Sequence, residues 1–250
     1  MIKTIIASLS ILFLLVCCKK PEPGSIPYTP VSVAPVITDT TTVPLPDTSV
    51  IRTYLALGDS YTIGQSVPET DRYPVQVVAL LKKLYIKFSQ PEIIAQTGWT
   101  TSNLLARLAS APPVNPTYDI VTLLIGVNNQ YRQRTQDEYR QEFTSLLTKA
   151  IEYAGNNNKR VFVLSIPDYS VTPFASGSNK ALISKQIDSF NVINKEIALQ
   201  HNVNYLNITG FTQLAATNPS LTASDGLHPS AIEYGVWAEK LVPMILDALK

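Results

Sequence analysis

The chain has 250 residues, of which 45% are apolar, and its formal net charge is only +1. This length allows one or two domains, and this apolar content is ordinary for a protein with a sizeable core. Such balanced charge offers no clustered basic face, so we expect no nucleic-acid partner. Cys17 and Cys18 are the only cysteines, so the rest of the chain can form neither a disulfide nor a thiolate metal site.

Residues 1–18 have the pattern of an export signal. Lys3 supplies a weak positive charge, and an apolar run follows over 5–16 that is too short for the ~20 residues of a membrane-spanning helix. The leucine-rich run that ends in cysteine resembles a bacterial lipoprotein signal, which implies a lipid anchor on Cys18 or, alternatively, on Cys17. The residues just before the cysteine are larger than that pattern prefers. An uncleaved anchor and an ordinary secretion signal are the alternatives.

Residues 19–50 differ in composition from what precedes and follows them. They contain seven prolines in a stretch rich in Thr, Ser and Val. Prolines at this density favour extended conformations and remove backbone donors. We therefore interpret this segment as a tether that holds a folded domain, residues 51–250, off a membrane. The expected location is the bacterial cell envelope, on either the periplasmic or the surface-facing side.

Short β-branched runs alternate with amphipathic helical patterns from residue 51 onward. The runs 120–125 and 160–165 are almost uninterruptedly apolar, as in strands that are covered on both faces. The predicted strands are 53–57, 92–95, 120–125, 160–165 and 204–207. The predicted helices are 75–88, 139–154, 183–197 and a last one from about Ser230, which Pro243 should bend.

This alternation predicts an α/β fold of three layers, α/β/α. Parallel strands need crossover connections, which place helices on both faces of the sheet. Five parallel strands favour a flavodoxin-like strand order, because right-handed crossovers leave few topologies. In such folds ligands bind beyond the carboxyl ends of the strands.

Chemically suggestive residues lie where predicted strands end. Gly58-Asp59-Ser60 follows the first strand, Gly98-Trp99 the second and Gly126-Val127-Asn128-Asn129 the third, and Asp225-Gly226-Leu227-His228-Pro229 lies near the end of the chain. Each segment alone is also an ordinary turn, since Gly, Asn, Asp and a helix-capping Ser are common turn residues. The four together, in this order, are a more specific signal.

Their order and spacing resemble the SGNH/GDSL hydrolase family, from Tyr54 to the C-terminus. The outer blocks, LALGDSYTIG and DGLHPS, are the most specific parts of the match. The resemblance implies a serine ester hydrolase. One departure is visible, because the third block of the family usually reads Gly-x-Asn-Asp and Asn129 stands here in place of the final Asp. The support that this carboxylate gives the loop is therefore in question.

Ester hydrolysis by a serine needs an adjacent base, because a hydroxyl is a poor nucleophile at neutral pH. His228 is the candidate base for Ser60, since an imidazole can accept and return a proton. Asp225, three residues earlier, can reach Nδ1 of the same imidazole and fix its tautomer. The other histidine, His201, lies at the predicted end of a helix, where we expect it to contact carbonyls or solvent.

The resemblance also implies an oxyanion hole. By this resemblance, its hydrogen-bond donors would be the backbone N–H groups of Ser60 and Gly98 and the side-chain amide of Asn128. The residue types agree with this role, because a serine that opens a helix has a free N–H, a glycine permits close approach and an amide is a neutral donor. This mechanism requires no cofactor and no metal.

The substrate is less determined than the mechanism, because the family includes carbohydrate O-acetylesterases, lysophospholipases, thioesterases and short-chain esterases. The candidate substrate-binding residues are Asp59, Trp99, Asn129 and Tyr131. No long apolar insertion indicates a lipase-type lid, so we expect a small acyl group such as acetyl, on a small-molecule or glycan ester. The alternatives are a lysophospholipase acting at the membrane and a non-catalytic, glycan-binding surface lipoprotein. The oligomeric state is left open.

Overall fold

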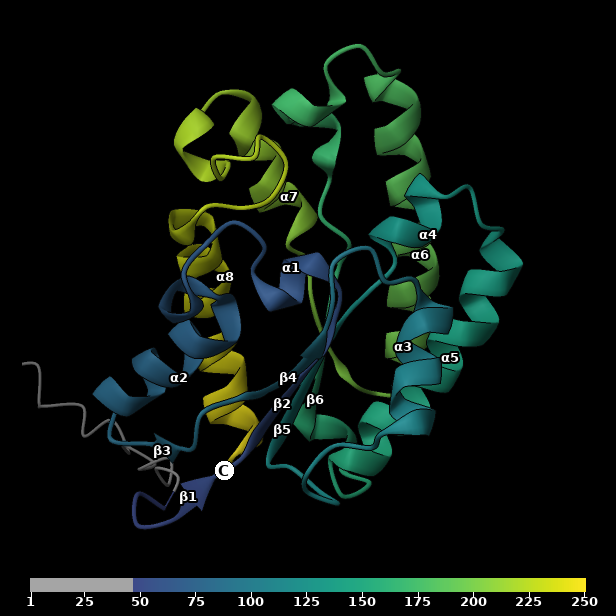
Figure 1. The fold of residues 1–250 in the computed structure, drawn as a ribbon. Coiled ribbons are helices and arrows are strands. Elements are labelled where there is room, and N and C mark those ends of the chain that lie inside the picture. Colours follow the sequence, from purple (N-terminus) through teal and green to yellow (C-terminus); the bar gives the residue numbers. More distant parts are fainter. Residues whose placement is uncertain (1–46) are drawn as a thin grey trace, which may run out of the picture. The chain divides into compact units, whose positions relative to one another are not determined.

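The structure is a computed structural model that describes residues 47–250, shown in Figure 1. The expectations for the signal, the lipid anchor and nearly all of the tether concern residues 1–46 and lie outside the described residues. Five parallel strands form the central sheet in the order β4-β2-β5-β6-β7, the flavodoxin-like order that the sequence predicted. Their bounds are β2 Tyr54–Gly58, β4 Glu92–Ala95, β5 Ile120–Leu124, β6 Val161–Leu164 and β7 Asn204–Leu206.

Helices cover both faces of this sheet, as expected for a three-layer α/β/α fold. In Figure 1, α2 and α8 lie on one side of the strands, and α3, α5 and α6 lie on the other. The long helices are α2 Tyr73–Lys83, α3 Thr101–Ser110, α5 Gln136–Tyr153, α6 Lys180–Gln200 and α8 Ala231–Ala248. The short ones are α1 Ser60–Ile63, α4 Val127–Tyr131 and α7 Thr209–Thr212. Six 3-10 turns complete the described chain: Glu69–Asp71, Asn158–Arg160, Tyr169–Val171, Pro173–Ala175, Gln213–Ala216 and Pro219–Leu221.

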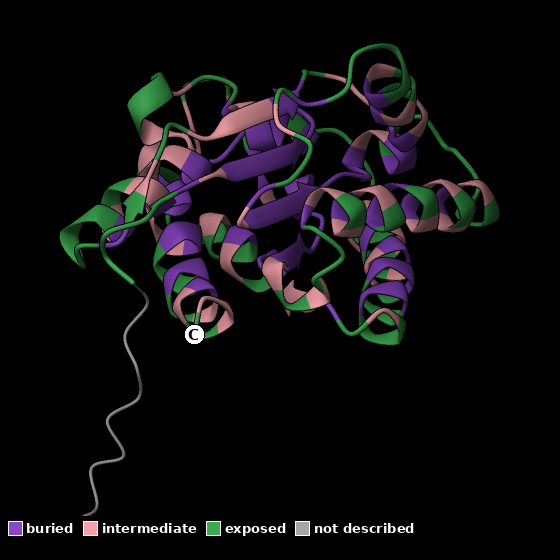
Figure 2. Cartoon of the chain, turned by 90° about the horizontal axis from the view of Figure 1, so that it is seen from below, coloured by how far each residue is buried: buried purple, intermediate pink, exposed green. Residues whose placement is uncertain are grey.

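The three middle strands are buried along their whole length, which explains their unbroken apolar sequences. Every residue of β2, β5 and β6 is buried, and Figure 2 shows these strands in purple between helices whose outer faces are exposed. The one polar residue within these strands, Thr122 of β5, is satisfied by the hydroxyls of Tyr54 and Tyr73, each 3.0 Å from its Oγ1. A buried hydroxyl without partners would be destabilising, so these bonds allow a polar residue in the centre of the sheet.

The helix predicted over 75–88 is shorter than expected. It ends at Lys83, because Tyr85 adopts a left-handed backbone conformation (φ 63°) and the N–H of Ile86 bonds to the carbonyl of Leu81. This turn buries Ile86 and directs the chain into β3, Lys87–Phe88, which pairs with β1, Ile51–Arg52. A non-glycine residue in this conformation leaves no sequence signal.

The other predicted helices are present, with small shifts at their ends. Thr135 and Asn179 cap α5 and α6 through side-chain bonds to backbone N–H groups, so both helices begin a few residues before the predicted starts. The last helix starts after the cap Ser230 and continues through Pro243. Among residues 47–250 no helix has both the length and the hydropathy needed to cross a membrane.

Candidate active site

The four blocks found in the sequence meet at the carboxyl end of the sheet. Ser60 lies just past β2, Asn128 lies on α4 just past β5, and His228 precedes α8, yet all three line one cavity. The second block joins them through the Asn128 amide, whose Nδ2 donates to the carbonyl of Trp99 at 3.0 Å. The sequence prediction that these blocks share one site therefore agrees with the geometry.

The nucleophile block makes an abrupt change from strand to helix. A Cβ on Gly58 would lie 2.1 Å from Thr62 Oγ1 and 2.4 Å from the carbonyl oxygen of Leu124, so only glycine fits at the end of β2. Asp59 then caps α1 by accepting the N–H of Tyr61 at 3.0 Å. This makes Ser60 the first residue of the helix, where its backbone N–H has no intrahelical acceptor and is available to an oxyanion.

Asp59 itself is a structural residue, which corrects its assignment as a substrate contact. The side chain is almost wholly buried and is not part of the cavity lining. Burial raises the pKa of Asp59 to about 7, against hydrogen bonds from the N–H groups of Tyr61 and Gly126 and from the Asn128 amide, which lower it. Asp59 therefore holds the first and third blocks together from beneath.

His228 and Asp225 are joined by a side-chain hydrogen bond, the contact that their spacing in the sequence predicted. Nδ1 of His228 lies 2.6 Å from Oδ2 of Asp225, and Oδ1 accepts the N–H groups of Leu227 and His228 at 3.0 Å each. The imidazole is buried, and its ring centroid lies 4.9 Å from that of Tyr61. With Nδ1 fixed on the carboxylate, Nε2 remains for proton transfer.

The charged form of Asp225 is strongly favoured. Partial burial raises the pKa of this carboxyl, but hydrogen bonds from Ser66, from His228 and from two backbone N–H groups outweigh burial and hold the pKa well below its usual range. Ser66 Oγ donates to Asp225 Oδ2 at 2.7 Å across 159 residues of sequence. The sequence analysis missed Ser66, since nothing in a turn serine predicts so distant a partner.

Gly98 is one of the residues predicted to form the oxyanion hole. Its φ of 84° lies in the left-handed region, which explains the glycine, and its carbonyl accepts a bond from Arg132 Nη2 at 2.8 Å. Asn128 donates one N–H of its amide to the Trp99 carbonyl, and the same amide also contacts Asp59, so an oxyanion would compete with Asp59 for the second N–H. The turn after α4 brings Arg132 to this loop; its place after the third block had left both the cleft and the solvated surface open.

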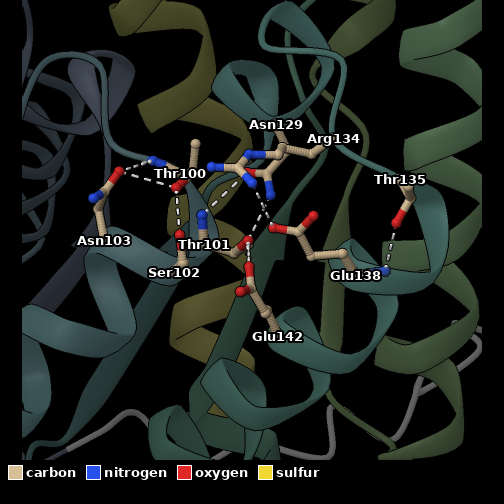
Figure 3. A network of polar contacts seen from close by, with 9 residues as sticks. All are labelled: Thr100, Thr101, Ser102, Asn103, Asn129, Arg134, Thr135, Glu138 and Glu142. Atoms are coloured by element: carbon tan, nitrogen blue, oxygen red, sulfur yellow. Dashed lines mark hydrogen bonds and ion pairs between the residues drawn. The ribbon is translucent and has the colours of Figure 1, made fainter.

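Asn129, predicted as a substrate-binding residue, lies beneath the cavity lining and connects the second and third blocks. It is fully buried; its Oδ1 accepts the N–H of Thr101 at 3.0 Å, and its Nδ2 donates to Thr101 Oγ1 at 2.6 Å. Figure 3 shows that the Thr101 hydroxyl in turn donates to Glu142. An aspartate at 129 would place two carboxylates around this one hydroxyl, so the amide suits Glu142 and still supports the loop.

The cavity beside Ser60 has a volume of about 130 Å³ and a mainly apolar wall. Besides the three catalytic candidates, its lining consists of aromatic and aliphatic side chains: Tyr61, Val127, Tyr131, Tyr169, Phe174 and Leu227. Among the four residues predicted to bind substrate, Tyr131 alone lies here. The Trp99 side chain packs against the hydrophobic core, and His201 caps the end of α6, as expected.

Three aromatic rings form one wall of this cavity, and the sequence suggested only Tyr131. The ring centroids of Tyr131, Tyr169 and Phe174 lie 6.1 to 6.4 Å from one another. Tyr131 and Phe174 remain 57% and 49% exposed, so these two rings form the outer, solvent-facing part of the wall. Tyr169 and Phe174 lie in the loop after β6, where no sequence pattern indicated a contribution.

Comparison with known proteins identifies a family and several solved structures of similar fold. The model of the GDSL-like lipase/acylhydrolase family matches residues 56–234. No curated protein is significantly similar to the chain. Among solved structures, the acetylxylan esterase Axe2 from Geobacillus stearothermophilus has a TM-score of 0.61 at 20% identity, covering 78% of this chain and 94% of its own. The lipase/acylhydrolase from Enterococcus faecalis has a TM-score of 0.61 at 19% identity, covering 79% and 97%.

Proposed function

The chain belongs to the GDSL-like lipase/acylhydrolase family and is a carboxylic ester hydrolase, and on this basis we propose that it removes a small acyl group, such as acetyl, from an alcohol such as a carbohydrate hydroxyl. The observation that carries the proposal is the cavity that Ser60, Asn128 and His228 share, with Asp225 bonded to the imidazole.

The proposed reaction has two halves. Ser60 Oγ attacks the ester carbonyl while His228 Nε2 takes its proton, and the carbonyl electrons move onto the oxygen facing Ser60 N–H, Gly98 N–H and the Asn128 amide. Collapse expels the alcohol, which takes the proton back from His228. Water then attacks the acyl-serine in the same way, releasing the acid and regenerating Ser60. Asp225 stabilises the imidazolium in both halves without accepting its proton.

The size of the cavity supports a short acyl chain. An apolar cavity of about 150 Å³ holds one benzene molecule, and the cavity here is about 130 Å³. The Tyr131, Tyr169 and Phe174 rings limit its extension. In the described part of the chain, none of the side chains lining it is Lys or Arg, the residues that would favour the phosphate of a lysophospholipid. The similarity of fold to an acetylxylan esterase is consistent with an acetylated glycan as substrate.

Hydrolysis of a p-nitrophenyl ester series, from acetate to palmitate, tests this proposal. We expect kcat/KM to be highest for acetate and to fall by roughly tenfold or more by octanoate, because added methylenes must displace packed rings. Phe174→Ala should flatten this decline by opening the wall. Tyr85→Ala, which removes an 80% exposed ring outside the cavity, is the matched control and should leave the profile unchanged.

Other outcomes of the series would favour the alternatives. Activity that rises with chain length in the wild type would overturn the short-acyl proposal in favour of a lysophospholipase or another lipid acyl hydrolase. Absence of turnover on every ester, and on acetylated xylo-oligosaccharides, would contradict the proposed hydrolysis and favour a glycan-binding surface protein.

For its location, we propose that the protein is exported and lipid-anchored in a bacterial cell envelope, with Cys18 as the anchor and Cys17 as the alternative. The support is the sequence pattern of residues 1–18 and the proline-rich stretch that follows. Replacing both cysteines by serine should move the protein from the membrane fraction to the soluble fraction, with Cys17→Ser and Cys18→Ser alone showing which residue is used. A doubly substituted chain that still sediments with membranes would exclude lipidation.

A further inference from the structure

The loop after α1 connects three parts of the site through two neighbouring side chains. Gln65 Oε1 accepts a hydrogen bond from Thr97 Oγ1 at 2.6 Å, next to the oxyanion glycine Gly98. Ser66 Oγ donates to Asp225 Oδ2 at 2.7 Å. The segment that carries Ser60 is therefore tied to the oxyanion loop on one side and to the acid–base turn on the other.

The bond from Ser66 ends on the oxygen that also serves the base. Asp225 Oδ2 receives both His228 Nδ1, at 2.6 Å, and the Ser66 hydroxyl, whereas Oδ1 receives only backbone N–H groups. A donor on this oxygen draws negative charge away from the imidazole. Ser66 is thus placed to influence proton transfer although it does not line the cavity.

The backbone of Ser66 indicates that this placement has an energetic cost. Its φ is 67°, in the left-handed region that non-glycine residues other than Asn, Asp and His rarely adopt. Val67 N–H bonds back to the Gly64 carbonyl, so the turn is tight. The conformation directs the hydroxyl at Asp225, and the hydrogen bond offsets part of the strain.

We propose that Ser66 is a positioning residue of the hydrolase, which orients the Asp225 carboxylate and sets the pH at which His228 becomes an effective base. This inference rests on the proposed function, because it requires that His228 act as the base. It adds a role for a residue outside the catalytic blocks.

The direction of the effect follows from electrostatics. Without the Ser66 hydroxyl, more negative charge stays on the oxygen that faces His228 Nδ1, and the protonated imidazole is stabilised. The base then needs a higher pH to lose its proton, so the acid limb of the kcat/KM profile, which reports the free enzyme, should move upward. The Asp225 side chain is 29% exposed, and water will replace part of the lost bond, so the shift should be a fraction of a pH unit.

Other titratable groups also surround His228, and a comparison of the wild type with a Ser66 variant must leave them unchanged. Tyr61 of α1 packs against the imidazole with its ring tilted by 54°, and Asp168, Tyr169 and Glu233 line a small cavity that His228 also lines. These groups come from three different segments of the chain. Because none of them bonds to Ser66, their influence is the same in the wild type and in a Ser66 variant.

The test measures kcat/KM for p-nitrophenyl acetate against pH in Ser66→Ala, Ser66→Gly and Gln65→Ala. We expect both Ser66 variants to shift the acid limb upward by roughly 0.3 to 0.5 pH units, a roughly two- to threefold loss at low pH, with near-normal rates on the alkaline side. Ser66→Gly also removes the backbone strain, so it provides a folded variant if Ser66→Ala is unstable. Gln65→Ala removes the other side-chain tie of the loop without touching Asp225, and its acid limb should not move.

Two results would overturn the inference. One is an acid limb in both Ser66 variants that coincides with the wild type, and the other is an equal shift in Gln65→Ala, which would show that loosening the loop is the cause. Either result leaves the proposed hydrolysis intact as long as turnover still depends on Ser60. Loss of that dependence would instead contradict the proposed function.

Discussion

Ser60→Ala should lower kcat/KM for p-nitrophenyl acetate by about 10⁴-fold or more. The variant removes the atom that would form the acyl-enzyme, and only the oxyanion donors would remain to assist water. Because Ser60 and His228 act in the same proton transfer, His228→Ala should cause a similar loss, and the double variant should be no worse than either single one. The measurement is steady-state hydrolysis with thermal unfolding of each variant alongside.

Folding and chemistry can be separated with a matched control. Ser110 lies on the exposed end of α3, where its hydroxyl bonds only to the carbonyl of Arg107, so Ser110→Ala should retain full activity. Ser60→Ala should unfold in one cooperative transition near the wild-type temperature. A Ser60→Ala protein with near-normal turnover would refute the serine mechanism.

Asn128→Ala should lower kcat by about 10² to 10³-fold and change KM little, because an oxyanion donor acts in the transition state and hardly at all in the bound ester. The same substitution frees the Trp99 carbonyl, which Asn128 holds at 3.0 Å, so part of the loss would come from a less fixed Gly98. Asn128→Asp should be at least as inactive, since a carboxylate of similar shape adds negative charge where the oxyanion forms.

A different effect of Asn128→Ala on kcat and KM would indicate a different role for Asn128. A raised KM with unchanged kcat would make it a substrate contact. Arg132→Met is the variant to compare with Asn128→Ala. It removes the bond to the Gly98 carbonyl but leaves the Asn128 side-chain amide and the Gly98 backbone N–H in place. Its loss of kcat should be smaller than that of Asn128→Ala.

Much of the fold was predictable because it depends on local patterns. The runs around Ile120–Leu124 and Val161–Leu164 are apolar since both faces of these strands are buried, and burial selects such residues directly. The helix Thr101–Ser110 was missed. Its start carries a local capping box, in which Asn103 Oδ1 accepts the N–H of Thr100 at 3.1 Å, and the prediction did not use this pattern. The bonds from Asn129 to Thr101 add a tie from another block that no local pattern reveals.

The candidate site divides in the same way. Ser60 and His228 stand in blocks whose spacing is itself the signal, and the structure brings them to one cavity. Asp59 stands next to Ser60 in the first block and Asn129 next to Asn128 in the third, yet both side chains are buried, because the direction of a side chain at or near the start of a short helix cannot be derived from its neighbours in sequence. Phe174 lines the cavity although it lies outside the four blocks, so only the folded structure reveals its position.

Catalytic activity depends on the completed fold, because the residues of the candidate site come from both ends of the domain. The strand that leads to Ser60, β2, lies near the middle of the sheet, and the turn that carries Asp225 and His228 lies within the last 26 residues of the chain. A nascent chain or one truncated before this turn has the nucleophile without its base. Contacts so distant in sequence form late and slowly during folding. With the proposed base in this position, we expect the hydrolase to be inert until its last segment has docked, so that incomplete copies cannot attack esters.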